Sequence, residues 1–231
     1  MKDDANDMEC AFQIPREGRY ADPTLTDLEI AATEWLDGFY QLEHLLAARE
    51  WAITLDPNAS TELRFAALVH DAERFFPGGP SGTPQDGFDN PDYLFAHSIR
   101  SADIVDEWLD TRQTPPSPTF RKRVRALILR HEIGGNPEED MMQAADSLAF
   151  LSTFDWLVLD WVANGFYTVE GVLEKLDWMF TRIRVSSAVP RALPLYVGIV
   201  TAVKQAGTAP FDTHERRQLA GHRPYLLGKR L

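Results

Sequence analysis

The sequence predicts an all-α protein, and three observations support this fold class. Apolar residues recur at helical spacing through most of the chain, and clusters of proline, glycine and N-cap residues separate these stretches. No alternation of apolar and polar residues between hairpin turns indicates a strand. We expect a helical domain over residues 24–210, preceded by a flexible arm over residues 1–23 and followed by a tail over residues 211–231. No internal repeat is visible.

The first half of the chain contains four predicted helices. The first starts with a capping-box pattern, Thr26 with Glu29, and extends to residue 36. Gly38 separates it from the second helix, and the others are bounded by turns. The second, third and fourth predicted helices cover residues 39–55, 61–75 and 93–109.

Residues 76–92 between the third and fourth helices are rich in proline and glycine, which excludes regular structure. A loop of this length is uncommon inside a compact domain. It is either a plain surface loop or a lid over a site.

The second half of the chain contains five further predicted helices, over residues 119–131, 138–152, 153–162, 168–185 and 190–205. Aromatic residues are frequent after Ser152. At helical spacing such residues are more often core than part of a substrate pocket. We therefore expect the helices over residues 153–206 to pack against the rest of the bundle.

Composition limits the compartment and the partners. The chain of 231 residues has a net charge of -12, and binding to long nucleic acid requires a cationic face, so such a partner is not expected. It has no apolar run long enough to span a bilayer and no signal peptide, so we expect a cytoplasmic protein without a membrane partner. With the single Cys10, a metal would be held by nitrogen and oxygen.

Five apolar residues lead directly into an adjacent imidazole and carboxylate, His70 and Asp71. Helical spacing of the apolar residues predicts that both polar side chains lie in the interior, where an unpaired polar group is unfavourable. Further ligand-type residues occur in similar apolar helical settings: His44, His97, His131 and Asp146. A single histidine on an apolar face is usually a hydrogen-bonded core residue, but four on separate predicted helices favour a metal site.

In chain order, these six residues resemble the ligands of the HD-domain superfamily of metal-dependent phosphohydrolases, including its two-metal members. The resemblance covers about residues 36–152 and implies an HD-type helical bundle to which the C-terminal helices are added. It implies a first ion bound by His44, His70, Asp71 and Asp146. Asp71 would bridge to a second ion bound by His97 and His131. Iron or manganese is expected, with zinc, cobalt or nickel as alternatives.

The function implied by the resemblance is hydrolysis of a small anionic phosphoester or nucleotide by a metal-activated hydroxide at a dinuclear site. The chain lacks the Gly-Tyr-Pro extension of cyclic-di-GMP phosphodiesterases. Residues 72–74 do not match the acidic pair of guanosine tetraphosphate hydrolases, so neither substrate is expected. The ligand order is also similar to the mixed-valent di-iron oxygenases of this superfamily, which cleave C–C or C–P bonds with dioxygen. A non-catalytic sensor or binding module is a third hypothesis.

Asp71 and Arg74 are the expected catalytic residues. Arg74 follows His70 by four positions, which places both on one face of a continuous helix. Arg74 is then either a clamp for a substrate phosphate or carboxylate, or part of a surface ion pair. Arg100, about one turn after His97, is a second candidate for substrate binding.

Other charged residues are weaker candidates. Glu73 is either a partner of a metal ligand or an exposed side chain, and exposure is the simpler interpretation. Further cations that could reach a pocket are Lys175, Arg182, Arg184 and Arg191. His214 and His222 lie in a region rich in charge and proline, and we expect both at the surface.

Overall fold

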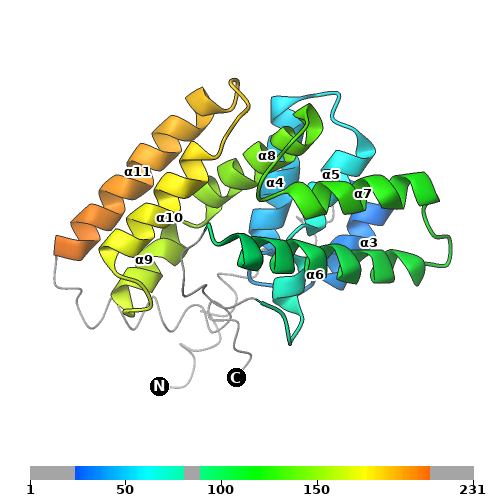
Figure 1. The fold of residues 1–231 in the computed structure, drawn as a ribbon, viewed down its shortest axis with the longest axis horizontal. Coiled ribbons are helices and arrows are strands. Elements are labelled where there is room, and N and C mark those ends of the chain that lie inside the picture. Colours follow the sequence, from blue (N-terminus) through cyan, green and yellow to red (C-terminus); the bar gives the residue numbers. More distant parts are fainter. Residues whose placement is uncertain (1–23, 81–88, 209–231) are drawn as a thin grey trace, which may run out of the picture.

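The computed structural model describes residues 24–80 and 89–208, and within these ranges it contains nine α-helices, one 3-10 helix and no strand (Figure 1). The predicted all-α fold is confirmed. The predicted arm and tail, with His214 and His222, and residues 81–88 of the predicted loop lie outside the described residues. None of the described helices combines the length and the apolar character that crossing a bilayer requires.

Two groups of helices lie side by side (Figure 1). The larger group comprises α3 (Asp27–Trp35), α4 (Leu42–Leu55), α5 (Thr61–Val69), the 3-10 helix η1 (Ala72–Phe75), α6 (Pro91–Asp110) and α7 (Pro118–Arg130). The smaller group, at the left of Figure 1, comprises α9 (Asp155–Ala163), α10 (Val169–Thr181) and α11 (Val189–Thr208). Between them, α8 (Pro137–Thr153) packs against helices of both groups.

Side-chain caps fix where most of these helices begin. The predicted capping box is present, since the Thr26 hydroxyl accepts from the Glu29 amide and the Glu29 carboxylate accepts from the Thr26 amide. Side-chain oxygens also cap the starts of α5, α6, α7, α8 and α10; they belong to Ser60, Asn90, Ser117, Asn136 and Thr168. Each such cap contributes about 1 kcal/mol.

The predicted continuous helix over residues 61–75 is wrong. Helix α5 ends at Val69, His70 is its C-cap, and Asp71 precedes the 3-10 helix. His131 likewise follows the end of α7, so three of the six predicted ligands lie at helix ends rather than inside helices. Adjacent side chains on an α-helix point about 100° apart. Here the helix has ended, and both side chains face one centre, with His70 Nε2 3.9 Å from Asp71 Oδ1.

The apolar core forms two clusters that share α8. Met142, Ala145 and Ala149 belong to the cluster of the larger helix group, whereas Ala144 and Leu148 belong to that of the smaller group. Every residue of α8 from 142 to 151 is buried. Because both faces of this helix are packed, a polar residue on it is held in place on all sides.

A buried ion pair joins the first two helices of the larger group. Arg49 of α4 is fully buried, and its Nε donates to Glu29 Oε1 of α3 at 2.6 Å. Another guanidinium nitrogen of Arg49 donates to the carbonyl of Thr24 at 2.6 Å. A buried charge is tolerated only when it is paired in this way.

Candidate metal centre

The six side chains predicted as metal ligands come together in the interior. His44 lies on α4, His97 on α6 and Asp146 on α8. His70, Asp71 and His131 lie in the turns after α5 and α7. The four histidines are at most 1 % exposed and the two aspartates at most 9 %. Residues separated by up to about a hundred positions therefore share one buried centre.

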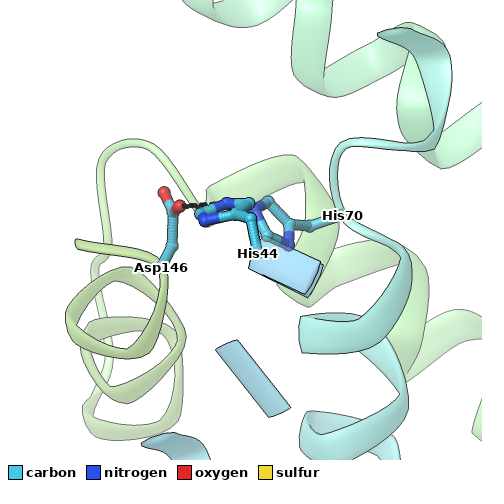
Figure 2. Close-up of side chains that lie close together, drawn as sticks. All are labelled: His44, His70 and Asp146. Carbon is cyan, nitrogen blue, oxygen red and sulfur yellow. Dashed lines mark ion pairs between the residues drawn. The ribbon is translucent and has the colours of Figure 1, made fainter. Parts of the chain in front are cut away.

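The first group of potential ligands consists of His44, His70 and Asp146. The Nε2 atoms of both histidines lie 3.3 Å from Asp146 Oδ1. Figure 2 shows the carboxylate facing the two rings. Phe154 stacks on His44 with ring centroids 4.7 Å apart, which fixes the plane of that imidazole.

Asp71 lies between this group and the other two histidines. Its Oδ1 atom is 2.8 Å from His97 Nε2, 3.7 Å from His131 Nε2 and 3.9 Å from His70 Nε2. Its other oxygen, Oδ2, accepts a hydrogen bond from Arg74 Nε at 3.1 Å. One oxygen of Asp71 is thus directed at three imidazoles.

Three of the four imidazoles are oriented through their Nδ1 atoms. His70 Nδ1 donates to the Ala67 carbonyl at 2.9 Å, and His131 Nδ1 to the Ile128 carbonyl at 2.7 Å. His97 Nδ1 donates to Glu73 Oε1 at 2.8 Å. A hydrogen bond at Nδ1 leaves Nε2 as the metal-binding nitrogen. In each case Nε2 faces the carboxylates.

His70 Nε2 provides a direct test of whether the site suits a cation. It is buried and has no hydrogen bond of acceptable geometry among the described residues, although Asp146 Oδ1 lies 3.3 Å away. Such groups are rare in folded proteins. Ligands bound at about 2.1 Å to one ion lie roughly 3–4 Å apart, as these two atoms do. The donor set therefore fits a divalent metal.

Electrostatics also favour a positive ion here. Burial lowers the pKa of His70, but Asp71 and Asp146 outweigh burial and raise that pKa to about 9. Burial raises the pKa of Asp146, but Arg182 and His70 outweigh it and hold the pKa well below its usual range. The carboxylates are thus ionised and stabilise a positive charge beside them, which a metal can supply in place of the proton.

Glu73 supports the site through its contact with His97, one of the predicted ligands. It is fully buried, so the interpretation of an exposed side chain is wrong. Its Oε1 accepts from His97, and its Oε2 lies 3.7 Å from Arg100 Nε. Arg100 also donates to the Pro77 carbonyl at 2.6 Å. The contacts of Arg100 therefore run to Glu73 and the loop, not to a metal ligand.

Two side chains that the ligand pattern missed or ranked low are part of the centre. Glu132, which is 8 % exposed, has Oε1 3.6 Å from His131 Nε2 and 4.0 Å from His97 Nε2. Arg182, at the end of α10, donates to both Glu132 and Asp146 and lies over the Trp178 ring. The sequence held one signal for Glu132: like Asp71, it directly follows a histidine at the end of a helix.

The remaining cations divide between the centre and the surface. Arg74 is 18 % exposed and donates to Asp71 and to Tyr93 Oη at 3.0 Å, so it is not a surface ion pair. The prediction that Arg74 shares a helix face with His70 is wrong, since α5 ends at Val69 and Arg74 lies in η1. Lys175 lies 4.5 Å from the centre of the Trp178 ring, and burial lowers its pKa to about 8. Arg184 and Arg191 are exposed.

Three overlapping groups of side chains could each hold an ion, with all ligand atoms of a group within 4.8 Å of one another. They are His44 with His70 and Asp146, His70 with Asp71 and His131, and His97 with His131 and Glu132. Comparisons of the chain with protein-family models, curated proteins and solved structures find no match.

Proposed function

We propose that this protein is a metal-dependent phosphohydrolase that acts on a small phosphoester or nucleotide at a dinuclear site. One observation carries the proposal: the six residues that resemble the HD-domain ligand set lie in one buried centre, with Nε2 of each histidine within 4 Å of a carboxylate oxygen. That arrangement supports both the resemblance and the activity that it implies.

Two divalent ions would be held by overlapping ligand sets. His44, His70 and Asp146 would bind the first, His97 and His131 would bind the second, and Asp71 would contribute to both. When bound, such a pair supplies Lewis acidity, which neutralises phosphate charge and lowers the pKa of a coordinated water. The contribution of the chain is to direct Nε2 of the imidazoles at the centre, in three of them through hydrogen bonds at Nδ1, and to keep the carboxylates ionised.

Arg74 has two roles in this proposal. Through Nε it holds Asp71 Oδ2, so that Oδ1 remains directed at the histidines. Its guanidinium also adds positive charge at the centre, together with Arg182 and Lys175, in a chain whose net charge is -12. Positive charge gathered at one site attracts an anionic substrate whatever the net charge of the protein.

The test is a screen of the full chain, loaded with Mn²⁺, against phosphate monoesters, phosphodiesters and nucleotides. We expect release of inorganic phosphate or of a nucleotide without a requirement for dioxygen. The Asp71→Asn variant should lose this activity, because the carboxylate that both ions share is gone. Asp106→Asn, which alters a partly exposed carboxylate paired with Arg121, should retain it.

Two outcomes would contradict the proposal. Protein that holds two metal ions but hydrolyses nothing in the panel would exclude the expected activity class. Protein that retains two irons, consumes dioxygen and shows the spin signal of a mixed-valent pair would be an oxygenase instead.

A further inference from the structure

The turn that carries His131 and Glu132 has the same local geometry as the turn that carries His70 and Asp71. Both histidines are helix C-caps, with φ and ψ of -59° and -32° for His70 and -58° and -32° for His131. Both donate through Nδ1 to the carbonyl three residues earlier. In each turn the next residue is an acid. The chain therefore presents an imidazole and a carboxylate to the centre twice, in the same way.

The turn after α7 is held firmly. Gln143 Nε2 donates to the Glu132 carbonyl at 2.9 Å, which ties the backbone of the turn to α8. Gly134 follows with φ of +66°, and its amide donates to the Arg130 carbonyl at 2.7 Å. A side chain at that glycine would meet Asp140 Oδ1 at 2.2 Å. The direction of Glu132 is thus set by the backbone.

Arg182 binds one oxygen of Glu132 and one oxygen of Asp146, and the other oxygen of each carboxylate faces the imidazoles. Its Nη1 donates to Glu132 Oε2 and its Nη2 to Asp146 Oδ2. The other oxygens face the imidazoles: Asp146 Oδ1 faces His44 and His70, whereas Glu132 Oε1 faces His97 and His131. Arg182 is itself fixed, since its Nε donates to Ser147 Oγ at 2.8 Å.

We infer that Glu132 is a seventh metal ligand, which gives the second ion a carboxylate of its own as Asp146 does for the first. Each ion then has two imidazoles, one private carboxylate and a share of Asp71. Arg182 is a positioning residue for both private carboxylates. The inference rests on the proposed dinuclear site and adds a ligand that the six-residue pattern does not contain.

If Glu132 were only a counter-ion of Arg182, the contacts of just one of its two oxygens would be explained. A counter-ion needs only its contact with the guanidinium, which Oε2 makes. A counter-ion role does not account for the position of Oε1. This oxygen is directed at His97 and His131, whose Nε2 atoms also face Asp71. The two roles predict different effects on metal binding.

The experiment measures Mn²⁺ binding to the full chain after removal of metal with a chelator. Calorimetric titration and elemental analysis give the affinity and the number of ions per chain. We expect two ions in the wild type. In Glu132→Gln we expect one ion to bind with wild-type affinity and the affinity for the second ion to fall by more than about 100-fold. This loss exceeds the usual effect of removing a residue that only supports a ligand. Glu138→Gln, which alters another arginine-paired glutamate, should bind both ions normally.

Arg182→Met separates the two roles of Glu132. If Glu132 is a ligand, loss of Arg182 weakens both ions by about 10- to 100-fold without selectivity. If Glu132 only pairs with Arg182, Glu132→Gln will lower the affinity for both ions as Arg182→Met does, and the inference is overturned. Should Glu132→Gln fail to fold, Glu132→Asp keeps the charge but draws the oxygens back, and must still weaken the second ion.

Outcomes for the wild type separate this inference from the proposed function. Two ions in the wild type with unchanged binding in both Glu132 variants would overturn the ligand role and leave the dinuclear site standing. A single ion in the wild type would overturn the dinuclear site and the inference that rests on it. No ion in the wild type would overturn the proposed function and the inference with it.

Discussion

His97 Nδ1 lies 2.8 Å from Glu73 Oε1, and neither side chain is exposed to solvent. A buried carboxylate beside an imidazole fixes the ring and its tautomer, and it increases the basicity of the opposite nitrogen. That nitrogen, His97 Nε2, faces Asp71 Oδ1 at 2.8 Å. Glu73 therefore acts on the centre through His97.

Replacing Glu73 tests this relationship. Glu73→Leu should weaken metal binding by about 10- to 100-fold, the usual effect of losing a residue that supports a ligand. Glu73→Gln should weaken it less, because the amide oxygen can still accept from Nδ1. Titration with Mn²⁺ measures both. The exposed Glu107 on α6, the helix that carries His97, provides the control, Glu107→Leu. Equal affinities in Glu73→Leu and the wild type would contradict the role.

Loss of Arg49 should strongly destabilise the fold. Arg49→Met leaves Glu29 buried without its cation, and breaking a buried pair on one side costs about 3–5 kcal/mol. Urea denaturation measures the free energy of unfolding. The double variant Glu29→Leu with Arg49→Met should recover most of the loss, since no unpaired charge remains. A single-variant effect under about 1 kcal/mol would contradict this role.

The matched control for Arg49 is a surface pair. Arg125 and Asp103 are 2.6 Å apart, with side chains that are 37 % and 51 % exposed. Because solvent screens exposed pairs, Arg125→Met should change the free energy of unfolding by less than about 1 kcal/mol.

The metal-free protein should lose stability as the pH rises. The pKa of His70 in the folded chain is about 9, above the ordinary 6.5. Its contribution to folding is therefore fully present below pH 6.5 and is lost as the pH rises through 9. In chelator, the urea midpoint of the wild type should fall across this window more than that of His70→Gln. Parallel curves for the two proteins would show that His70 carries no proton.

Sequence reasoning succeeded where a feature is local or repeats along one helix. Thr26 and Glu29 lie three residues apart, so the capping box could be predicted from the chain alone. The apolar settings of His44, His97 and Asp146 predicted burial, and all three are buried. Periodicity reports which face of a helix is apolar, and these residues lie on such faces.

Sequence reasoning failed where the chain leaves a helix. Periodicity continues smoothly from α5 into η1, so the break at His70 and Asp71 was not visible. Glu132 was missed because it lies in a turn, outside any helical pattern. Its partner Arg182 comes from a helix fifty positions later, and no local pattern connects the two. Contacts of this kind are set by packing of distant helices.

The number of ions bound per chain tests the central claim most directly. Elemental analysis of the wild type, after reloading with Mn²⁺ and removal of free metal, should give two ions per chain. Asp71→Asn should lose most of this binding, because the shared carboxylate is gone. A wild type that holds no ion, or an Asp71→Asn variant that binds as the wild type does, would contradict the proposed metal centre.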